Sequence, residues 1–264
     1  MWWTWDSGFA EWDGFGLPPA VQSSNPVLRR DPFVPSGSVY GTMTVQGTVA
    51  KTAVLLVLAL ITGSVTWILA RKGAPVWSFV GVAGTWALLF GITLLFKPQW
   101  SPVLAPLYAM MEGVAVGGAS FGFEQKYPGI VVAAAGASAS TLAALLFAYQ
   151  SGLIRATGLF KRVVRIATWG IVLFAITQIA LLFFFNVGLF LEVHGSGLIG
   201  IGFSVFVGVI AALNLVIDFD RIEEWARVGA PEYFEWYSAF SLMVTLLWLY
   251  FEILRLLAKL SKRR

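Results

Sequence analysis

Long apolar runs separated by short polar joints make up most of the chain after Lys51. Seven runs are present, at residues 52–70, 75–96, 103–123, 129–149, 163–187, 195–217 and 231–258. Each has about the 20 residues that an α-helix needs to cross the hydrocarbon core of a bilayer. The joints are too short to contain further domains. The pattern therefore predicts an all-α membrane protein, in which residues 49–264 form one bundle of seven transmembrane helices.

Residues 1–48 lack this pattern. They are rich in Gly, Pro, Ser and Asp, and their opening stretch interleaves Trp and Phe with acidic residues. Such a composition buries too little apolar surface to fold, so we predict a disordered tail whose aromatic rings can enter a membrane interface. Because no cationic start leads directly into a short apolar core, a cleaved signal peptide is not expected.

The overall composition excludes the soluble class. Of the 264 residues, 58% are hydrophobic and 12% are charged. Soluble domains have about half apolar and about a quarter charged residues. The net charge of +4 does not indicate a nucleic-acid partner, because the basic residues lie beside the apolar runs, where membrane topology accounts for them.

The basic residues also bear on whether the last apolar run crosses the membrane. If the N-terminus is inside and all seven runs cross, ten basic residues lie inside and eight outside. If the last run folds back instead, its five basic residues join the inside and the split becomes fifteen to three. The positive-inside rule then favours six spans plus a re-entrant last helix. Both arrangements stay open at this point.

Small residues are concentrated in the third and fourth runs. The third contains Gly113, Gly117 and Gly118, and the fourth contains an Ala, Gly and Ser stretch at residues 133–140. Small residues let membrane helices approach each other closely. We therefore expect tight helix packing along both runs.

Acidic side chains within or at the ends of the apolar runs are the candidate functional residues, because a charge in a membrane requires a partner, water or a function. They are Glu112, Asp218, Asp220, Glu235 and Glu252. Glu112 lies about 14 Å into the third run. It is either a structural acid, protonated or paired with Arg, or a cation or proton site. Arg255 follows Glu252 by three residues, a spacing that predicts a local ion pair.

No enzyme motif accompanies these acids. The sequence lacks the His-Glu-x-x-His motif of metalloproteases, the Gly-x-Gly-Asp motif of intramembrane aspartyl proteases and a Gly-rich phosphate loop. It has no Cys and one His, which excludes a thiolate site and a His-rich zinc cluster. We expect no catalysis, no resident metal and no cofactor.

Several stretches resemble the Bax inhibitor-1 (transmembrane Bax inhibitor motif) family, and its bacterial, YccA-like branch in particular. The main one is AALNLVIDFD at residues 211–220, followed by an aromatic final run that carries Glu. Others are SNPVLR at 24–29, YAMMEG at 108–113, YPGI at 127–130 and YQSGLIR at 149–155. The similarity extends from about Ser24 to the C-terminus and excludes the aromatic opening of the tail.

This resemblance implies a fold, an activity and a location. The fold is a seven-helix bundle whose last helix is wrapped by the others, and the activity is a pH-sensitive calcium leak. In the family, an Asp at the end of the sixth helix shares a hydrogen bond with an Asp on the last helix, which closes the pore until deprotonation loosens it. The bacterial branch implies the bacterial plasma membrane.

Asp218 matches the first acid of that pair, whereas the second is ambiguous. The family pattern Tyr-x-Asp occurs on the last run twice with Glu in place of Asp, ending at Glu235 and Glu252. These two residues are about 25 Å apart along a straight helix. Asp218 ends the sixth run and Glu235 begins the seventh, so we favour Asp218 with Glu235 as the latch. Glu252 then pairs with Arg255 or meets Glu112, and Asp220 is a further pore candidate.

Three functions follow. The first is a proton-modulated leak whose carboxylate oxygens suit calcium, with Ca²⁺ as permeant ion rather than cofactor. The second is a non-catalytic interaction protein that binds membrane proteases or other membrane complexes, for which the aromatic tail would matter. The third, proton-coupled solute transport, has no inverted repeat to support it. The expected partners are the lipid bilayer, Ca²⁺ or protons and membrane proteins.

Overall fold

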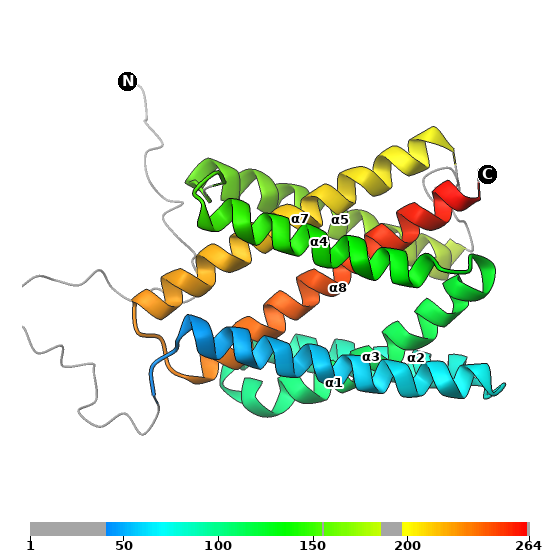
Figure 1. Cartoon of the computed structure of the whole chain (residues 1–264), viewed down its shortest axis with the longest axis horizontal. Coiled ribbons are helices and arrows are strands. Elements are labelled where there is room, and N and C mark those ends of the chain that lie inside the picture. Colours follow the sequence, from blue (N-terminus) through cyan, green and yellow to red (C-terminus); the bar gives the residue numbers. More distant parts are fainter. Residues whose placement is uncertain (1–40, 155, 186–196, 263–264) are drawn as a thin grey trace, which may run out of the picture. The chain divides into compact units, whose positions relative to one another are not determined.

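The computed structural model describes residues 41–154, 156–185 and 197–262. These residues form seven long α-helices and one 3₁₀ turn, with no strand among them. The elements are α1 (Val45–Arg71), α2 (Val76–Phe96), η1 (Pro98–Trp100), α3 (Ser101–Lys126), α4 (Ile130–Gln150), α5 (Gly158–Phe185), α7 (Leu198–Arg227) and α8 (Tyr233–Ser261). The predicted all-α helical bundle is confirmed (Figure 1).

Six of these helices are long and apolar enough to cross a membrane. They are α1, α2, α3 with its preceding turn, α4, α7 and α8. Many of their large apolar side chains point away from the bundle; Leu60 is 69% exposed and Val132 is 78% exposed. In water such a surface would drive aggregation, whereas in a bilayer it faces lipid tails. The chain is an integral, multi-pass membrane protein.

The last helix, α8, lies inside the bundle and packs against α1, α3, α4 and α7. In the view of Figure 1, α8 crosses obliquely from α1 toward α4. Near its start, Glu235 contacts Lys51 of α1, and near its end Lys259 donates a hydrogen bond to the carbonyl of Gly200 at the start of α7. α8 therefore runs from one end of the bundle to the other, as a full crossing requires, and the predicted wrapping of the last helix is confirmed.

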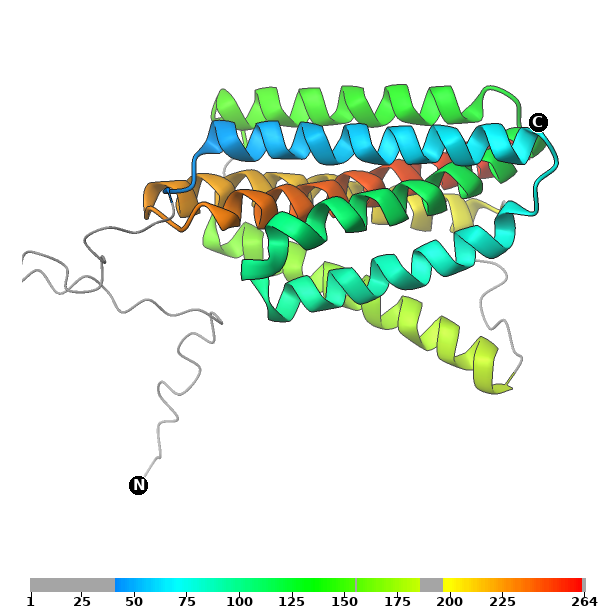
Figure 2. The same ribbon diagram turned by 90° about the horizontal axis from the view of Figure 1, so that it is seen from below.

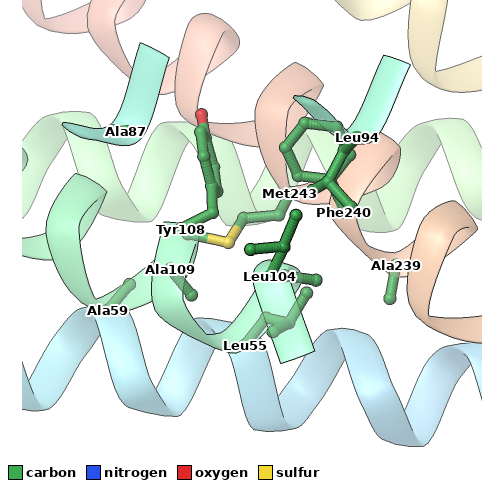
Figure 3. Close-up of a cluster of buried hydrophobic side chains, with 11 residues drawn as sticks. Leu55, Ala59, Ala87, Leu94, Leu104, Tyr108, Ala109, Ala239, Phe240 and Met243 are labelled. Carbon is green, nitrogen blue, oxygen red and sulfur yellow. The ribbon is translucent and has the colours of Figure 1, made fainter. Parts of the chain in front are cut away.

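One apolar cluster joins α8 to α1, α2 and α3 (Figure 3). Leu55, Leu94 and Met243 are fully buried in it, and the Tyr108 and Phe240 rings meet edge to face with centroids 4.8 Å apart. Lipid tails are as apolar as these side chains, so close packing rather than the hydrophobic effect stabilises the contact. This cluster fixes the position of α8 in the bundle.

Small residues hold α1 and α3 close together. A Cβ atom on Gly117 would overlap the backbone of Gly63, and one on Gly113 would overlap the backbone of Ala59. The close packing predicted for the third run is therefore confirmed. The fourth run differs, because Ala134 and Ser138 are buried while most of the small residues between 133 and 140 are exposed.

A short extended segment, residues 41–44, precedes α1 and pairs with the joint between α7 and α8. The Met43 N–H donates to the Ala230 carbonyl at 2.7 Å, and the Glu232 N–H donates to the Gly41 carbonyl at 2.8 Å. We call this segment the strap. Residues 41–48 thus belong to the bundle although hydropathy assigned them to the tail, and residues 1–40 lie outside the described part of the chain.

Candidate functional site

Asp218 belongs to α7, and its side chain faces α8. Two hydroxyl groups of α8 hold its carboxylate. Thr245 Oγ1 donates to Oδ2 at 2.7 Å, and Ser241 Oγ donates to Oδ1 at 3.3 Å. Both donors are uncharged. Arg221, one turn further along α7, is exposed and acts on the carboxylate through space without forming an ion pair with it among the described residues.

The structure does not bring Asp218 and Glu235 together, in contrast to the latch favoured from the sequence. The sixth apolar run was taken to end near Asp218, but α7 continues to Arg227. Two antiparallel helices joined by a short turn pair residues at equal distances from that turn. Asp218 precedes the end of α7 by nine residues, so it faces α8 about nine residues from its start, near Ser241 and Thr245.

Glu235 instead anchors the start of α1. Its Oε1 accepts hydrogen bonds from the Thr44 backbone N–H at 2.7 Å and the Thr44 hydroxyl at 2.9 Å, and its Oε2 lies 2.5 Å from Lys51 Nζ. The Thr44 hydroxyl in turn caps α1 by accepting from the Gly47 N–H at 2.9 Å. Glu235 is 5% exposed, and every contact it makes stabilises the attachment of α1 to α8.

The secondary candidates occupy three separate places. Glu252 is buried and forms the predicted ion pair with Arg255, whose Nη1 lies 2.7 Å from Oε1. Asp220 forms an ion pair with Lys161 of α5. Glu112 is half-buried on α3, one turn after Tyr108. These acids are thus spread along the bundle rather than gathered into one cluster.

A row of polar side chains follows one face of α8 and was missed at the level of sequence. We call it the polar seam; it consists of Glu235, Ser238, Ser241, Thr245, Glu252 and Lys259. The members are three, four or seven residues apart, which places them on one helix face. Ser238 is 2% exposed and Lys259 is 7% exposed. This spacing is readable in the sequence, but only the two acids, Glu235 and Glu252, were selected from it, because charged residues were sought.

The polar seam is interrupted between Thr245 and Glu252. The intervening residues on that side include Leu249, which is 2% exposed and packs in an apolar cluster with Leu215 of α7. Trp248 packs against the same cluster. A hydrated ion therefore has no continuous polar route along α8 in this conformation.

No three His, Cys, Asp or Glu side chains lie close enough to hold a metal ion within residues 41–154, 156–185 and 197–262. Polar groups around the C-terminal half of α8 form hydrogen bonds with one another. Lys259 Nζ donates to the Ser204 hydroxyl and to the Gly200 carbonyl, both at 2.8 Å. Asp218 differs from Glu235, Glu252 and Asp220, each of which is paired with a cation, because its hydrogen-bond donors are two neutral hydroxyls.

A central helix enclosed by apolar, membrane-length helices, with acidic groups at its contacts, defines a multi-pass membrane protein with a polar interior. The chain belongs to the Bax inhibitor 1 like family, whose family model matches residues 25–262. This confirms the family indicated by the sequence motifs. No curated protein and no solved structure gives a match. The YccA-like branch and the bacterial plasma membrane stay predictions.

Proposed function

We propose that the protein is a pH-sensitive leak pathway for calcium or other cations, acting without catalysis or a cofactor. The observation that carries the proposal is the setting of Asp218. Its carboxylate lies at the contact of α7 with the polar seam, and its hydrogen-bond donors are two neutral hydroxyls. A carboxylate without a bound cation can both take up a proton and attract a passing cation.

The direction of the pH effect follows from these contacts. When Asp218 is protonated it carries no charge and offers no attraction to a cation. When it is ionised, the negative charge favours entry of cations into the polar seam and is opposed only by the field of Arg221. We therefore expect the leak to increase as the pH rises. Asp218 contacts the Ser241 and Thr245 hydroxyls instead of a second acid, so in this proposal a single carboxyl group sets the response.

Conduction also requires the apolar interruption of the polar seam to open. Leu249 and Trp248 separate Thr245 from Glu252, so in this proposal we assign this conformation to the closed pathway. Ionisation of Asp218 places a charge beside apolar neighbours, which favours entry of water between α7 and α8. Movement of α7 relative to α8 would then open a hydrated path past Leu249, between the two halves of the polar seam.

The test is calcium flux into proteoliposomes of the purified protein from about pH 3 to about pH 8, a range that includes ordinary carboxyl and imidazole titration. Wild type is compared with Asp218→Asn, and Asp220→Asn serves as a matched control because Asp220 is paired with Lys161. We expect wild-type flux to rise with pH, Asp218→Asn to abolish that rise and Asp220→Asn to preserve it. An unchanged flux and pH profile in Asp218→Asn would contradict the proposal.

The competing function is binding of membrane proteases or other membrane complexes through the N-terminal tail. The tail can be removed without disturbing the strap, because backbone hydrogen bonds of residues 41–44 fix the strap to the α7–α8 joint. A function of the tail can therefore be tested separately from that of the bundle. Deletion of residues 1–40 would leave these bonds in place. Loss of partner capture with intact flux would assign the tail a separate binding role, whereas a folded wild-type protein with no flux would favour this second function.

A further inference from the structure

A groove of about 400 Å³ lies between α1 and α4, away from Asp218. Figure 2 shows that α1 and α4 lie on the same side of α8, so α8 runs beneath the gap that separates them in Figure 1. Leu60 and Ile68 of α1 and Val132 of α4 form the apolar walls. Gly117 of α3 and Tyr250 of α8 contribute to the floor.

The groove has the form of a site for a hydrocarbon chain. Along α1 it extends from Ala59 to Ile68, a length of about 14 Å. Its polar floor groups are matched to each other, since the Ser120 and Tyr250 hydroxyls are hydrogen-bonded at 2.8 Å. An apolar chain can therefore occupy the groove without leaving these hydroxyls unpaired.

One end of the groove lies at the level expected for lipid headgroups. Trp67 lines this end, and Trp is enriched at membrane interfaces. Glu124 also lines it, but its carboxylate accepts hydrogen bonds from the Gly129 and Val131 N–H groups at the start of α4, at 2.6 and 3.1 Å. The positive end of the α4 dipole offsets this negative charge.

Exposed cations surround the same end. Arg71 and Lys72 follow Ile68 by about one helical turn, and Lys126 ends α3. None of the three forms an ion pair among the described residues. An apolar groove leading to a group of cations at interface depth complements a lipid with a negative headgroup.

We propose that this groove binds one acyl chain of an anionic glycerophospholipid, with the headgroup phosphate against Arg71, Lys72 and Lys126. The bilayer supplies such a lipid laterally, through the gap between α1 and α4. Basic residues attract anionic headgroups, and the hydrocarbon chain gains close contact with the groove walls. This site is independent of the proposed leak.

The acyl-chain part is tested with phosphatidylglycerol that carries a photoreactive diazirine in its acyl chain, in vesicles of phosphatidylcholine. Peptide mapping of the full-length protein should show labelling concentrated on residues 59–68 and 131–132. Ser64 is an exposed groove residue, so Ser64→Trp should fill the groove and abolish this labelling. Ser140→Trp, on the exposed side of α4 outside the groove, is the matched control and should not change it.

The headgroup part is tested by comparing the same label on phosphatidylglycerol and on phosphatidylcholine. We expect groove labelling to favour phosphatidylglycerol, and Arg71→Gln with Lys72→Gln to reduce that preference about tenfold. Arg162→Gln with Arg165→Gln, exposed residues near the start of α5, removes the same charge and should have no effect. Even labelling of α1, α2 and α4, or persistent labelling in Ser64→Trp, would overturn the site. Equal labelling by both lipids would overturn the anionic headgroup.

Discussion

Glu235 and Asp218 are both acids at the contacts of α8, and they differ in what holds them. Glu235 is buried against a cation, Lys51, and two Thr44 donors at the end of the bundle. Asp218 is half-buried at the contact of α7 with α8 and has two neutral hydroxyl donors. Removing one partner of a buried ion pair is costly, whereas a carboxylate with neutral partners can change protonation state without breaking an ion pair. The first acid is therefore structural, and the second is the candidate sensor.

The largest expected effect comes from removing the cation beside Glu235. Lys51→Met should destabilise the protein by about 3 kcal/mol, because it leaves a buried carboxylate without its charge partner. The midpoint of thermal unfolding in detergent measures the loss. Lys161→Met is the matched control, since its partner Asp220 is more exposed and the pair should contribute less than about 1 kcal/mol. Equal losses in the two variants would refute the structural role of Glu235.

A somewhat smaller effect should follow from crowding the same carboxylate. A Cβ on Gly47 would overlap both Glu235 oxygens, so Gly47→Ala should cost about 2 kcal/mol of stability. Gly81 is a helical glycine with open space around it, and Gly81→Ala should stabilise α2 by about 0.5 kcal/mol. Unfolding midpoints that shift in opposite directions would support the tight Glu235 site; a stabilising Gly47→Ala would not.

The smallest effect on stability is expected from a change next to Asp218. The same change should shift the pH dependence of cation flux. Thr245→Val removes the shorter of its two hydrogen bonds and should cost about 1 kcal/mol. Since the hydroxyl stabilises the ionised carboxylate, its loss should move the pH profile of cation flux to higher pH. Thr85→Val, an exposed threonine that donates within its own helix, is the control. A profile that stays in place after Thr245→Val would show that Asp218 does not set the response.

The sequence predicted the fold more fully than the site. Hydropathy located all seven long helices of the described residues, because runs of about twenty apolar residues have few structural alternatives. It missed the polar end of α7, residues 218–227, because charged residues after an apolar run resemble a joint as much as a helix. That error of ten residues displaced the expected partner of Asp218 from Ser241 to Glu235.

The partners of Asp218 were difficult to predict for a second reason. Ser and Thr are common in membrane helices and usually hydrogen-bond to their own backbone, as Thr85 and Thr141 do here. Nothing in the sequence distinguishes Thr245 from them. The pairing of Lys51 with Glu235 was equally difficult to predict, because a lysine at the start of an apolar run is also what the positive-inside rule leads one to expect. Both assignments depend on which helices meet in three dimensions.

The contact between Lys51 and Glu235 has a consequence for biosynthesis, because the two residues are 184 positions apart in the chain. As the chain is synthesised from its N-terminus, α1 emerges long before the helix that supplies its carboxylate partner. Until α8 enters the bundle, Lys51 lacks its anion and the strap lacks the joint to which it binds. Insertion of the last helix therefore stabilises the first one. A chain truncated before α8 would leave Lys51 without its carboxylate partner and the strap without its hydrogen bonds.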